Sequence, residues 1–384
     1  MSGAELRPAW AEVDLGAVER NTALMARAAH PAAVCAVVKA DAYGHGAVAA
    51  SRAALAGGAR WLAVALVEEG LELRRAGVGA PVLVLSEPPP QAMALVADHR
   101  LTPTVYSPAA LEAASAAARA RGQALPVHVK VDTGMHRVGA GPELALELAT
   151  RAQADPWLEL EGLWTHLAVA EDPADPFTEE QLGRLGEVVS RLERRGGRPA
   201  LVHAANTAGA LAHPASRLDM VRCGISLYGY LPSGPVAACL EAAGLPAPEP
   251  ALSLKAKVCH VRRLSRGERV SYGRRYQLAE DAWVATVPLG YADGVPRRLF
   301  KAGGQVLVGG RRRPLAGVVT MDQLMVDCGA DPEPAVGDEV VLLGRQGSEA
   351  VWADEWARRC GTIAYEVLCG IGARVPRRPV GSQA

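Results

Sequence analysis

Residues 32–66 read AAVCAVVKADAYGHGAVAASRAALAGGARWLAVAL, which is an apolar run, an Ala-rich stretch and a second apolar run. This alternation continues over the first 230 residues. We interpret eight apolar runs as strands, at 32–39, 61–66, 81–86, 101–106, 125–132, 158–166, 199–206 and 220–226. Strands that alternate with helices predict a parallel sheet covered on both faces, and eight of them favour a closed (β/α)8, TIM-like barrel.

The flanks of this region predict a second domain. A strand-like run at 11–15 and a helix at 17–29 precede the barrel, and residues 231–250 are rich in Pro, Gly and Ala, as in a linker. Later strands are expected at 252–263, 268–273, 282–289, 305–309, 314–328 and 338–343. We therefore expect a barrel domain over 1–240 and a mostly β domain over 241–384, on which residues 1–15 can pack.

Two local patterns add detail to this outline. Ser107 followed by Pro108 predicts the start of a helix that runs to Arg121, because Ser is a favoured N-cap and Pro a favoured first helical residue. The cluster Arg311–Arg313 is expected in a solvated turn.

Composition excludes several classes of protein. The chain has 384 residues, with 41 Lys and Arg against 41 Asp and Glu, so it lacks the basic excess of a nucleic-acid binder. Its seven cysteines are widely spaced and form no CxxC pair, which argues against a disulfide framework or a zinc site. We see no signal peptide and no membrane helix, and we expect a cytoplasmic protein without membrane partners.

Residues 44–49, GHGAVA, nearly match the dinucleotide-binding pattern G-x-G-x-x-A. In that pattern the glycines turn directly off a strand, so that the backbone can approach a pyrophosphate. Here Lys39-Ala-Asp-Ala-Tyr43 intervenes between the strand and the glycines, and we set nicotinamide binding aside.

Polar residues end several of the predicted barrel strands, where barrel enzymes place their active sites. Lys39 ends the first strand and is one of only five lysines, and a lysine beside desolvating groups and other cations can form a Schiff base. The remaining strand-end candidates are Lys130, Arg137, His166, Asn206, Thr207, Arg222, Gly224 and Ile225. Together they predict one site at the barrel mouth.

Some of these residues suit a phosphate group. The ends of strands seven and eight often bind phosphate in this fold, and the Thr207 hydroxyl with the backbone N–H groups of Gly224 and Ile225 would serve. Tyr43 would add a phenol donor. A Schiff-base lysine beside a phosphate site predicts pyridoxal 5'-phosphate as the cofactor.

The same residues belong to motifs that resemble alanine racemase, in order and over about residues 9–377. The motifs are AVVKADAYGHG (36–46), VKVDTGMHRVG (129–139), THLA (165–168), HAANTAG (203–209), MVRCGISLYG (220–229), VSYGRRY (270–276), VPLGYADG (287–294), MDQ (321–323) and YEVLCGIGARVPR (365–377). The resemblance implies the pyridoxal-phosphate-dependent interconversion of L-alanine and D-alanine, which supplies D-alanine for peptidoglycan.

The resemblance also implies two catalytic groups. Lys39 would hold the cofactor and act as base on one face of the substrate Cα, and Tyr272 would serve the opposite face. In the family this tyrosine comes from the partner subunit, which implies a head-to-tail homodimer with shared active sites. Arg222 would contact the pyridine nitrogen, and His166 would link Arg222 to Tyr272 by hydrogen bonding.

Further roles follow from the resemblance in the same way. Arg137 would lie near the cofactor's phenolic oxygen and the substrate carboxylate, and Lys130 matches a position that is often carbamylated. The phosphate would bind at Tyr43, Thr207, Gly224 and Ile225, with Asn206 and His203 behind them. Met321 and Asp322 would reach the partner's site and receive the substrate carboxylate, and Tyr291 would narrow the entry. Ala373 stands where some members have a tyrosine that contacts the phosphate.

Other activities stay open from the sequence alone. The alternatives are a racemase of another small amino acid such as serine, a fold-type III amino-acid decarboxylase, and a non-enzymatic pyridoxal-phosphate carrier. Decarboxylases of this fold place a carboxylate at the pyridine nitrogen, so Arg222 argues against them. The β domain that carries Tyr272 argues against a simple carrier.

Overall fold

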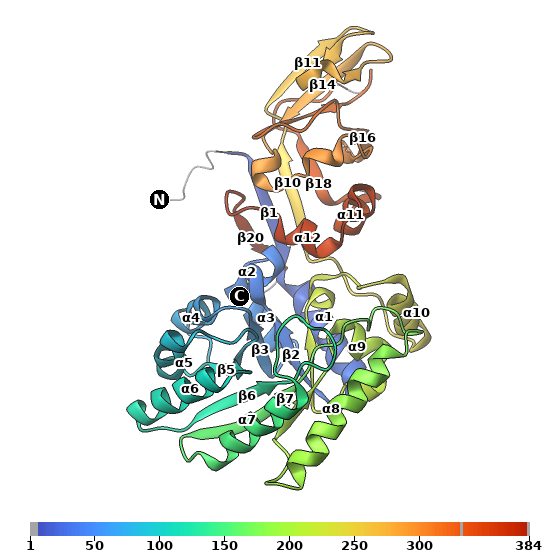
Figure 1. Ribbon diagram of the computed structural model, residues 1–384. Coiled ribbons are helices and arrows are strands. Elements are labelled where there is room, and N and C mark those ends of the chain that lie inside the picture. Colours follow the sequence, from blue (N-terminus) through green and yellow to red (C-terminus); the bar gives the residue numbers. More distant parts are fainter. Residues whose placement is uncertain (1–6, 331–332, 382–384) are drawn as a thin grey trace. The chain divides into compact units, whose positions relative to one another are not determined.

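The structure is a computed structural model that describes residues 7–330 and 333–381 (Figure 1). Its backbone contacts divide the chain into two compact units. We call residues 17–42 and 47–249 the barrel unit. Of the described residues, 7–16, 43–46, 250–330 and 333–381 form the β unit. The predicted domain boundary between residues 240 and 241 stays a prediction, and residues 1–6 of the predicted N-terminal segment lie outside the described residues.

The barrel unit contains eight parallel strands, and this confirms the predicted (β/α)8, TIM-like barrel. They pair in the order β8-β7-β6-β5-β4-β3-β2-β9. Their bounds are β2 Ala33–Val37, β3 Trp61–Val64, β4 Val82–Val84, β5 Thr102–Val105, β6 Leu125–Lys130, β7 Leu158–Trp164, β8 Leu201–His203 and β9 Met220–Cys223. Two backbone hydrogen bonds, Asp219 to Val202 and Arg222 to Ala205, join the two ends of the sheet.

Helices lie around these strands (Figure 1). They are α1 Leu15–Ala29, α3 Ala47–Ala56, α4 Val67–Arg75, α5 Met93–Asp98, α6 Pro108–Arg121, α7 Pro142–Ala154, α8 Phe177–Glu193, α9 Thr207–Ala212 and α10 Gly234–Ala242. Most strand residues are buried, as expected for parallel strands covered on both sides. The predicted start of α6 is confirmed, because the Ser107 hydroxyl accepts a hydrogen bond from the Ala110 N–H at 3.2 Å.

The β unit contains two larger sheets and one β-ribbon. The main sheet has the order β16-β15-β18-β10-β1-β20, with β19 beside β18; a second sheet is β11-β14-β17, and β12 pairs with β13. The bounds are β1 Ala9–Asp14, β10 Leu252–Lys257, β11 His260–Leu264, β12 Arg269–Val270, β13 Tyr276–Gln277, β14 Ala282–Val287, β15 Gln305–Val308, β16 Arg311–Pro314, β17 Leu324–Asp327, β18 Glu339–Gln346, β19 Glu349–Val351 and β20 Arg377–Val380. Helices α11 Ala353–Cys360 and α12 Ala364–Cys369 complete the unit.

The structure corrects five local predictions. The expected strand 252–263 is divided between β10, in the main sheet, and β11, in the second sheet. The expected linker contains helix α10, which the Ser233 hydroxyl caps. The run 268–273 forms only the two-residue strand β12, and 314–328 is divided between β16 and β17. The Arg311–Arg313 cluster lies in β16 rather than in a turn, because the Arg312 guanidinium pairs with Glu349 and Glu355.

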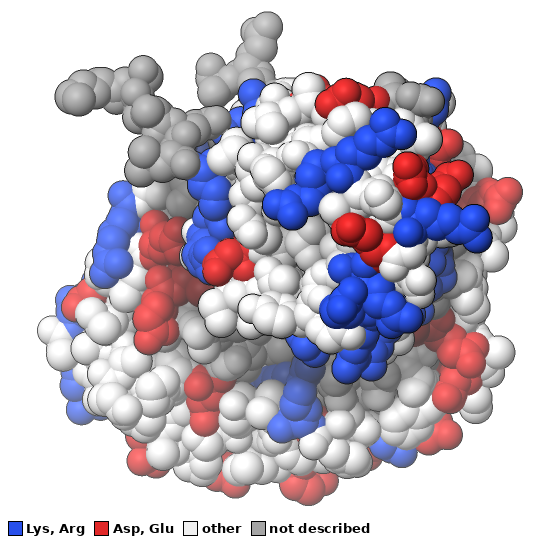
Figure 2. Space-filling view, turned by 90° about the horizontal axis from the view of Figure 1, so that it is seen from above, with Lys and Arg blue, Asp and Glu red and all other residues white. Residues whose placement is uncertain are grey.

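Charges of both signs are spread over the face that Figure 2 shows.

The segment after β2 has an unusual backbone. Residues 39–44 form the short helical turn α2, but Ala40, Asp41, Ala42 and Tyr43 all have φ between 52° and 55°, so the turn is left-handed. For L-residues this costs roughly 1–2 kcal/mol each. Glu69 compensates for part of this cost: its carboxylate accepts hydrogen bonds from the N–H groups of Ala40, Ala65 and Leu66, at 2.6, 2.8 and 3.1 Å.

We predict that Glu69→Ala destabilises the protein by about 2 kcal/mol, because three N–H groups lose a charged acceptor and the left-handed turn loses a tether. Urea unfolding curves of the variant and the parent protein measure the difference. Glu68→Ala is the matched control, since Glu68 is exposed on the same turn of α4 and should change stability by less than about 0.5 kcal/mol. Equal effects of the two substitutions would contradict the tether.

Candidate active site

The barrel unit brings most of the predicted site residues to one end of its sheet. Lys39 follows β2, Lys130 ends β6, His166 follows β7, and Arg222 lies near the end of β9. Arg137 lies in the loop after β6, Asn206 and Thr207 follow β8, and Gly224 and Ile225 follow β9. Because parallel strands end at the same rim of a barrel, these residues share the carboxyl-terminal rim.

Arg222 is the centre of the hydrogen-bond network. Its guanidinium is buried and donates to the Thr165 and Ala204 carbonyl oxygens, both at 2.9 Å. It also bonds to Nδ1 of His203 at 2.8 Å and to Nδ1 of His166 at 3.2 Å. No carboxylate is among these four partners. Burial lowers the pKa of Arg222 to about 10, so the group stays charged at neutral pH.

Two histidines serve as acceptors for this cation. Burial and the positive charge of Arg222 hold the pKa of His166 and of His203 well below the usual value, so both imidazoles are neutral. Because Nδ1 of each ring faces an Arg222 N–H, the proton of each ring must be on Nε2. His166 therefore keeps an Nε2–H donor that does not face Arg222.

Cations outnumber acids at this rim. Burial and the charges of Arg222, Arg137 and Lys39 lower the pKa of Lys130 to about 7, with Asp132 opposing them. The Trp164 ring lies against the same charges, with Lys130 Nζ 4.4 Å and the Arg222 Cζ 4.5 Å from its centroid. A rim with this surplus of positive charge favours anionic ligands.

Polar groups at the ends of β8 and β9 form a small cradle. The Thr207 hydroxyl accepts the Gly224 N–H at 3.1 Å and lies 3.4 Å from the Ser226 hydroxyl. Thr207 is the first residue of α9, and the Asn206 side chain caps that helix by accepting the Gly209 N–H at 2.9 Å. Hydroxyls and backbone N–H groups in this arrangement can bind a phosphate.

The β unit holds the other predicted residues. The backbones of Tyr291 and Ala292 donate to the Thr320 and Met321 carbonyl oxygens, both at 3.0 Å, so Tyr291 lies beside Met321 and Asp322. The Ser271 hydroxyl donates to the Val318 carbonyl at 2.7 Å, which brings Tyr272 to the same segment.

These side chains differ in their surroundings. Tyr272 is 71% exposed and Met321 54%, whereas the Asp322 carboxylate pairs with Arg374 at 2.7 Å. Tyr43 also belongs to the β unit, where its ring packs 6.0 Å from that of Tyr365. The β unit thus gathers Tyr272, Tyr291, Met321 and Asp322 into one cluster with an exposed phenol.

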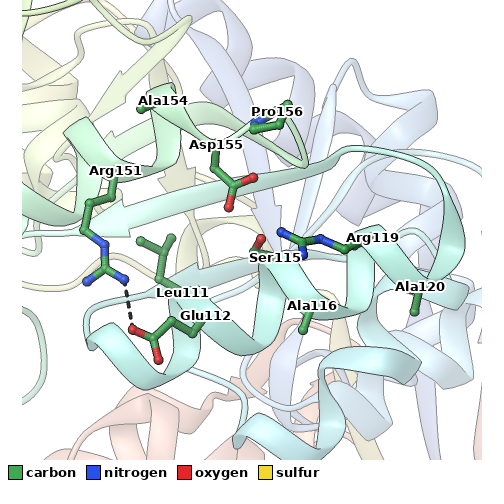
Figure 3. A pocket seen from close by; sticks show the side chains of 10 residues that line it. All are labelled: Leu111, Glu112, Ser115, Ala116, Arg119, Ala120, Arg151, Ala154, Asp155 and Pro156. Carbon is green, nitrogen blue, oxygen red and sulfur yellow. Dashed lines mark hydrogen bonds and ion pairs between the residues drawn. The ribbon is translucent and has the colours of Figure 1, made fainter.

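A separate hollow lies on the outside of the barrel unit (Figure 3). It has a volume of about 780 Å³ and is lined by α6, by the end of α7 and by the segment that leads into β7. An ion pair between Arg151 and Glu112, at 2.9 Å, crosses it. Because Asp155 and Pro156 precede β7, the hollow is at the amino-terminal ends of the strands and takes no part in the candidate site.

Sequence reasoning missed His128, Glu161 and Trp164, which surround the predicted residues. His128 lies two positions before Lys130 on β6, and that spacing placed it on the same face of the strand. Trp164 ends β7 and stacks on His203, with ring centroids 5.5 Å apart. The placement of Glu161 depends on a β-bulge, which leaves no recognisable sequence pattern.

Family models match most of the chain. The model of the alanine racemase N-terminal domain matches residues 13–232, and that of the alanine racemase C-terminal domain matches residues 251–379. A curated relative, the alanine racemase of Symbiobacterium thermophilum, is 45% identical over 372 residues, which are 97% of each chain.

Solved structures agree with this match. The alanine racemase of Streptomyces lavendulae has a TM-score of 0.91 and 38% identity, and the alignment covers 99% of this chain and 98% of the other. A histidine racemase of Leuconostoc mesenteroides has a TM-score of 0.88 at 30% identity, with 99% and 100% covered. From the matched models, the curated relatives and these structures it follows that the chain belongs to the alanine racemase family of isomerases.

Proposed function

We propose that this protein interconverts L-alanine and D-alanine with pyridoxal 5'-phosphate as cofactor, by a two-base mechanism in which Lys39 and Tyr272 act on opposite faces of the substrate Cα. The observation that carries the proposal is the Arg222 network: a buried cation whose four hydrogen-bond partners include no carboxylate, and whose charge acts on Lys130 and His166 together with that of Lys39. The motifs shared with alanine racemases support the same assignment.

The residues at the barrel rim fit the cofactor. Lys39 would hold it covalently, Thr207 with Gly224 and Ile225 would bind the phosphate, and Arg222 would donate to the pyridine nitrogen. The surplus of cations suits a phosphate and a substrate carboxylate, with Arg137 available for the latter. The bound cofactor supplies an electron sink that acidifies the α-hydrogen of the amino acid.

The state of Arg222 bears on which reaction is favoured. Its positive charge and four fixed partners make it a donor only, so the pyridine nitrogen facing it would stay unprotonated. The ring is then a weaker electron sink than one facing a carboxylate. This limits decarboxylation and transamination, and it favours a racemase over the decarboxylase alternative.

The proton must leave one face of Cα and return on the other, so two groups are needed. The Lys39 amine would serve one face and the exposed Tyr272 phenol of a partner subunit the other. His166 has its proton on Nε2 and can donate it to a phenolate, which would lower the pKa of the tyrosine. This arrangement requires a homodimer in which each active site uses both subunits.

The remaining assignments complete the proposal. Tyr291, Met321 and Asp322 lie together with Tyr272 in the β unit and would line the entry and the substrate carboxylate site. A narrow entry would favour a small amino acid, and we assign alanine as the substrate. D-Alanine would be the product, for use in peptidoglycan. Ala373 is exposed and offers no hydrogen-bond donor to the phosphate from its side chain.

The first prediction concerns Lys39. Purified protein mixed with pyridoxal phosphate should become yellow, and reduction with borohydride should fix the cofactor on Lys39, because the imine becomes a stable amine. Peptide mass spectrometry locates the label. Lys39→Ala should take up no covalent label, whereas Lys257→Ala, which removes an exposed lysine of β10, should be labelled like the parent. Labelling of another lysine would overturn the cofactor assignment.

The second prediction concerns Tyr272. Tyr272→Phe should keep the visible absorbance of the bound cofactor and lose racemisation by roughly 10²–10⁴-fold, the usual contribution of one general acid–base group. Circular dichroism of alanine follows the reaction. Tyr276→Phe is the control, since the Tyr276 hydroxyl is engaged with Asp327. Unchanged turnover in Tyr272→Phe would contradict the two-base mechanism.

Mixing two inactive variants tests the shared active site. In a dimer of Lys39→Ala with Tyr272→Phe, one site carries both changes and the other carries neither. Random mixing after reversible dissociation should therefore restore about a quarter of the parent activity, because half of the dimers are mixed and each has one intact site. A mixture as inactive as its components would show that each subunit works alone.

A further prediction concerns carbamylation of Lys130. The neutral Nζ attacks carbon dioxide and releases a proton to form the carbamate, so modification requires the unprotonated amine. With a pKa of about 7, lowered by burial and nearby cations, the amine loses its proton as the pH rises through neutrality. In ¹³C-bicarbonate a carbamate NMR signal should grow over that range and be absent in Lys130→Arg. A signal in that variant would place the modification elsewhere.

A further inference from the structure

A row of hydrogen-bonding groups extends from Arg222 through the barrel unit. Arg222 bonds to His203 Nδ1 at 2.8 Å, and His203 Nε2 lies 2.9 Å from His128 Nδ1. His128 Nε2 in turn faces Glu161 Oε2 at 3.4 Å. Both histidines are fully buried, while the Glu161 side chain is 22% exposed. The row therefore joins the buried cation to a carboxylate through two imidazoles.

The backbone is shaped to admit this row. On β7, Leu160 pairs with Val127 of β6, and Gly162 pairs with His128, so Glu161 is the extra residue of a β-bulge. Strict alternation would turn Glu161 to the same side as the exposed Glu159, whereas a bulge re-aims a side chain. A Cβ at position 162 would lie 2.4–2.6 Å from three atoms of the His128 ring, so only glycine leaves room for it.

The two charged ends dictate where the protons are. Arg222 can only donate, so His203 Nδ1 accepts and Nε2 carries the proton. His203 Nε2–H then donates to His128 Nδ1, and the His128 proton must be on Nε2, where it points to the carboxylate. Burial lowers the pKa of both rings, so each is neutral. A carboxylate at the far end fits this order of donors and acceptors.

We infer that Glu161 is a positioning residue of the racemase: its carboxylate faces the proton on His128 Nε2 and so holds the two imidazoles, and through them Arg222, in place. The inference rests on the proposed function, because Arg222 matters through its contact with the cofactor. Glu161 acts as the remote counter-ion of Arg222, at a distance that leaves the pyridine nitrogen without an acid beside it.

The test is Glu161→Gln in the cofactor-loaded enzyme labelled with ¹⁵N-histidine. A glutamine side chain lacks the charge that faces His128 Nε2, while Arg222 still fixes both tautomers from the other end of the row. We expect both rings to keep the Nε2–H form and the ¹⁵N shift of His128 Nε2 to change, with His128→Gln giving the assignment. We expect kcat for alanine to fall on the order of tenfold with KM nearly unchanged, as for a loss of positioning that acts in the transition state and not in substrate binding.

Glu159→Gln is the matched control, because it removes the same charge from the exposed position two residues earlier on β7, and it should leave the histidine shifts and kcat unchanged. Unaltered histidine shifts in Glu161→Gln would overturn the inference. The inference would also be overturned if the histidine shifts changed while kcat stayed at the parent value, because Arg222 would then not depend on the row of histidines. Failure of the proposed function is seen separately, as a parent enzyme that does not racemise alanine.

Discussion

The burial of the Arg222 guanidinium is the constraint on which the rest of the site depends. A charge removed from water needs compensation, and among the described residues no carboxylate is a hydrogen-bond or ion-pair partner of Arg222. Two carbonyl oxygens, two neutral imidazoles and the face of Trp164 surround it instead. Each of these partners stabilises the cation without neutralising it. The guanidinium therefore remains a rigid donor whose field lowers the pKa of Lys130 and of both histidines.

A second constraint places the lysine in this field. The chain leaves β2 in a left-handed turn, and the strain of four successive residues with positive φ persists only because tethers hold both ends. Glu69 holds the Ala40 N–H, and Asp41 accepts the Ala47 N–H at the start of α3. The same turn occupies the place where a dinucleotide-binding loop would lead from strand to glycine. The near-match at residues 44–49 thus has a different backbone and a different task.

The sequence predicted the features that follow from the regular alternation of strands and helices. It missed the features that arise where regular structure is interrupted. Eight buried runs between helices predicted the barrel, because burial on both faces produces continuous apolar strands. Strand ends then predicted Lys39, His166 and Arg222 at one rim. The left-handed turn, the bulge at Glu161 and the strand formed by Arg311–Pro314 have no such pattern, since each is fixed by contacts distant in sequence. The roles of Tyr272 and Met321 came from resemblance alone.

The charges of the barrel rim bear on the proposed mechanism, in which the second proton-transfer group comes from a partner subunit. Lys130, Arg137 and Arg222 are cations or are surrounded by them, and His166 is held neutral as an acceptor for Arg222. Asp132, the acid that opposes them, accepts hydrogen bonds from Gly134 and His136 that lower its pKa and make it a weak base. In the proposed mechanism Lys39 exchanges a proton with one face of Cα. A phenol from a partner subunit would act on the opposite face without disturbing the field of Arg222, and Tyr272, which is exposed, is proposed for that role.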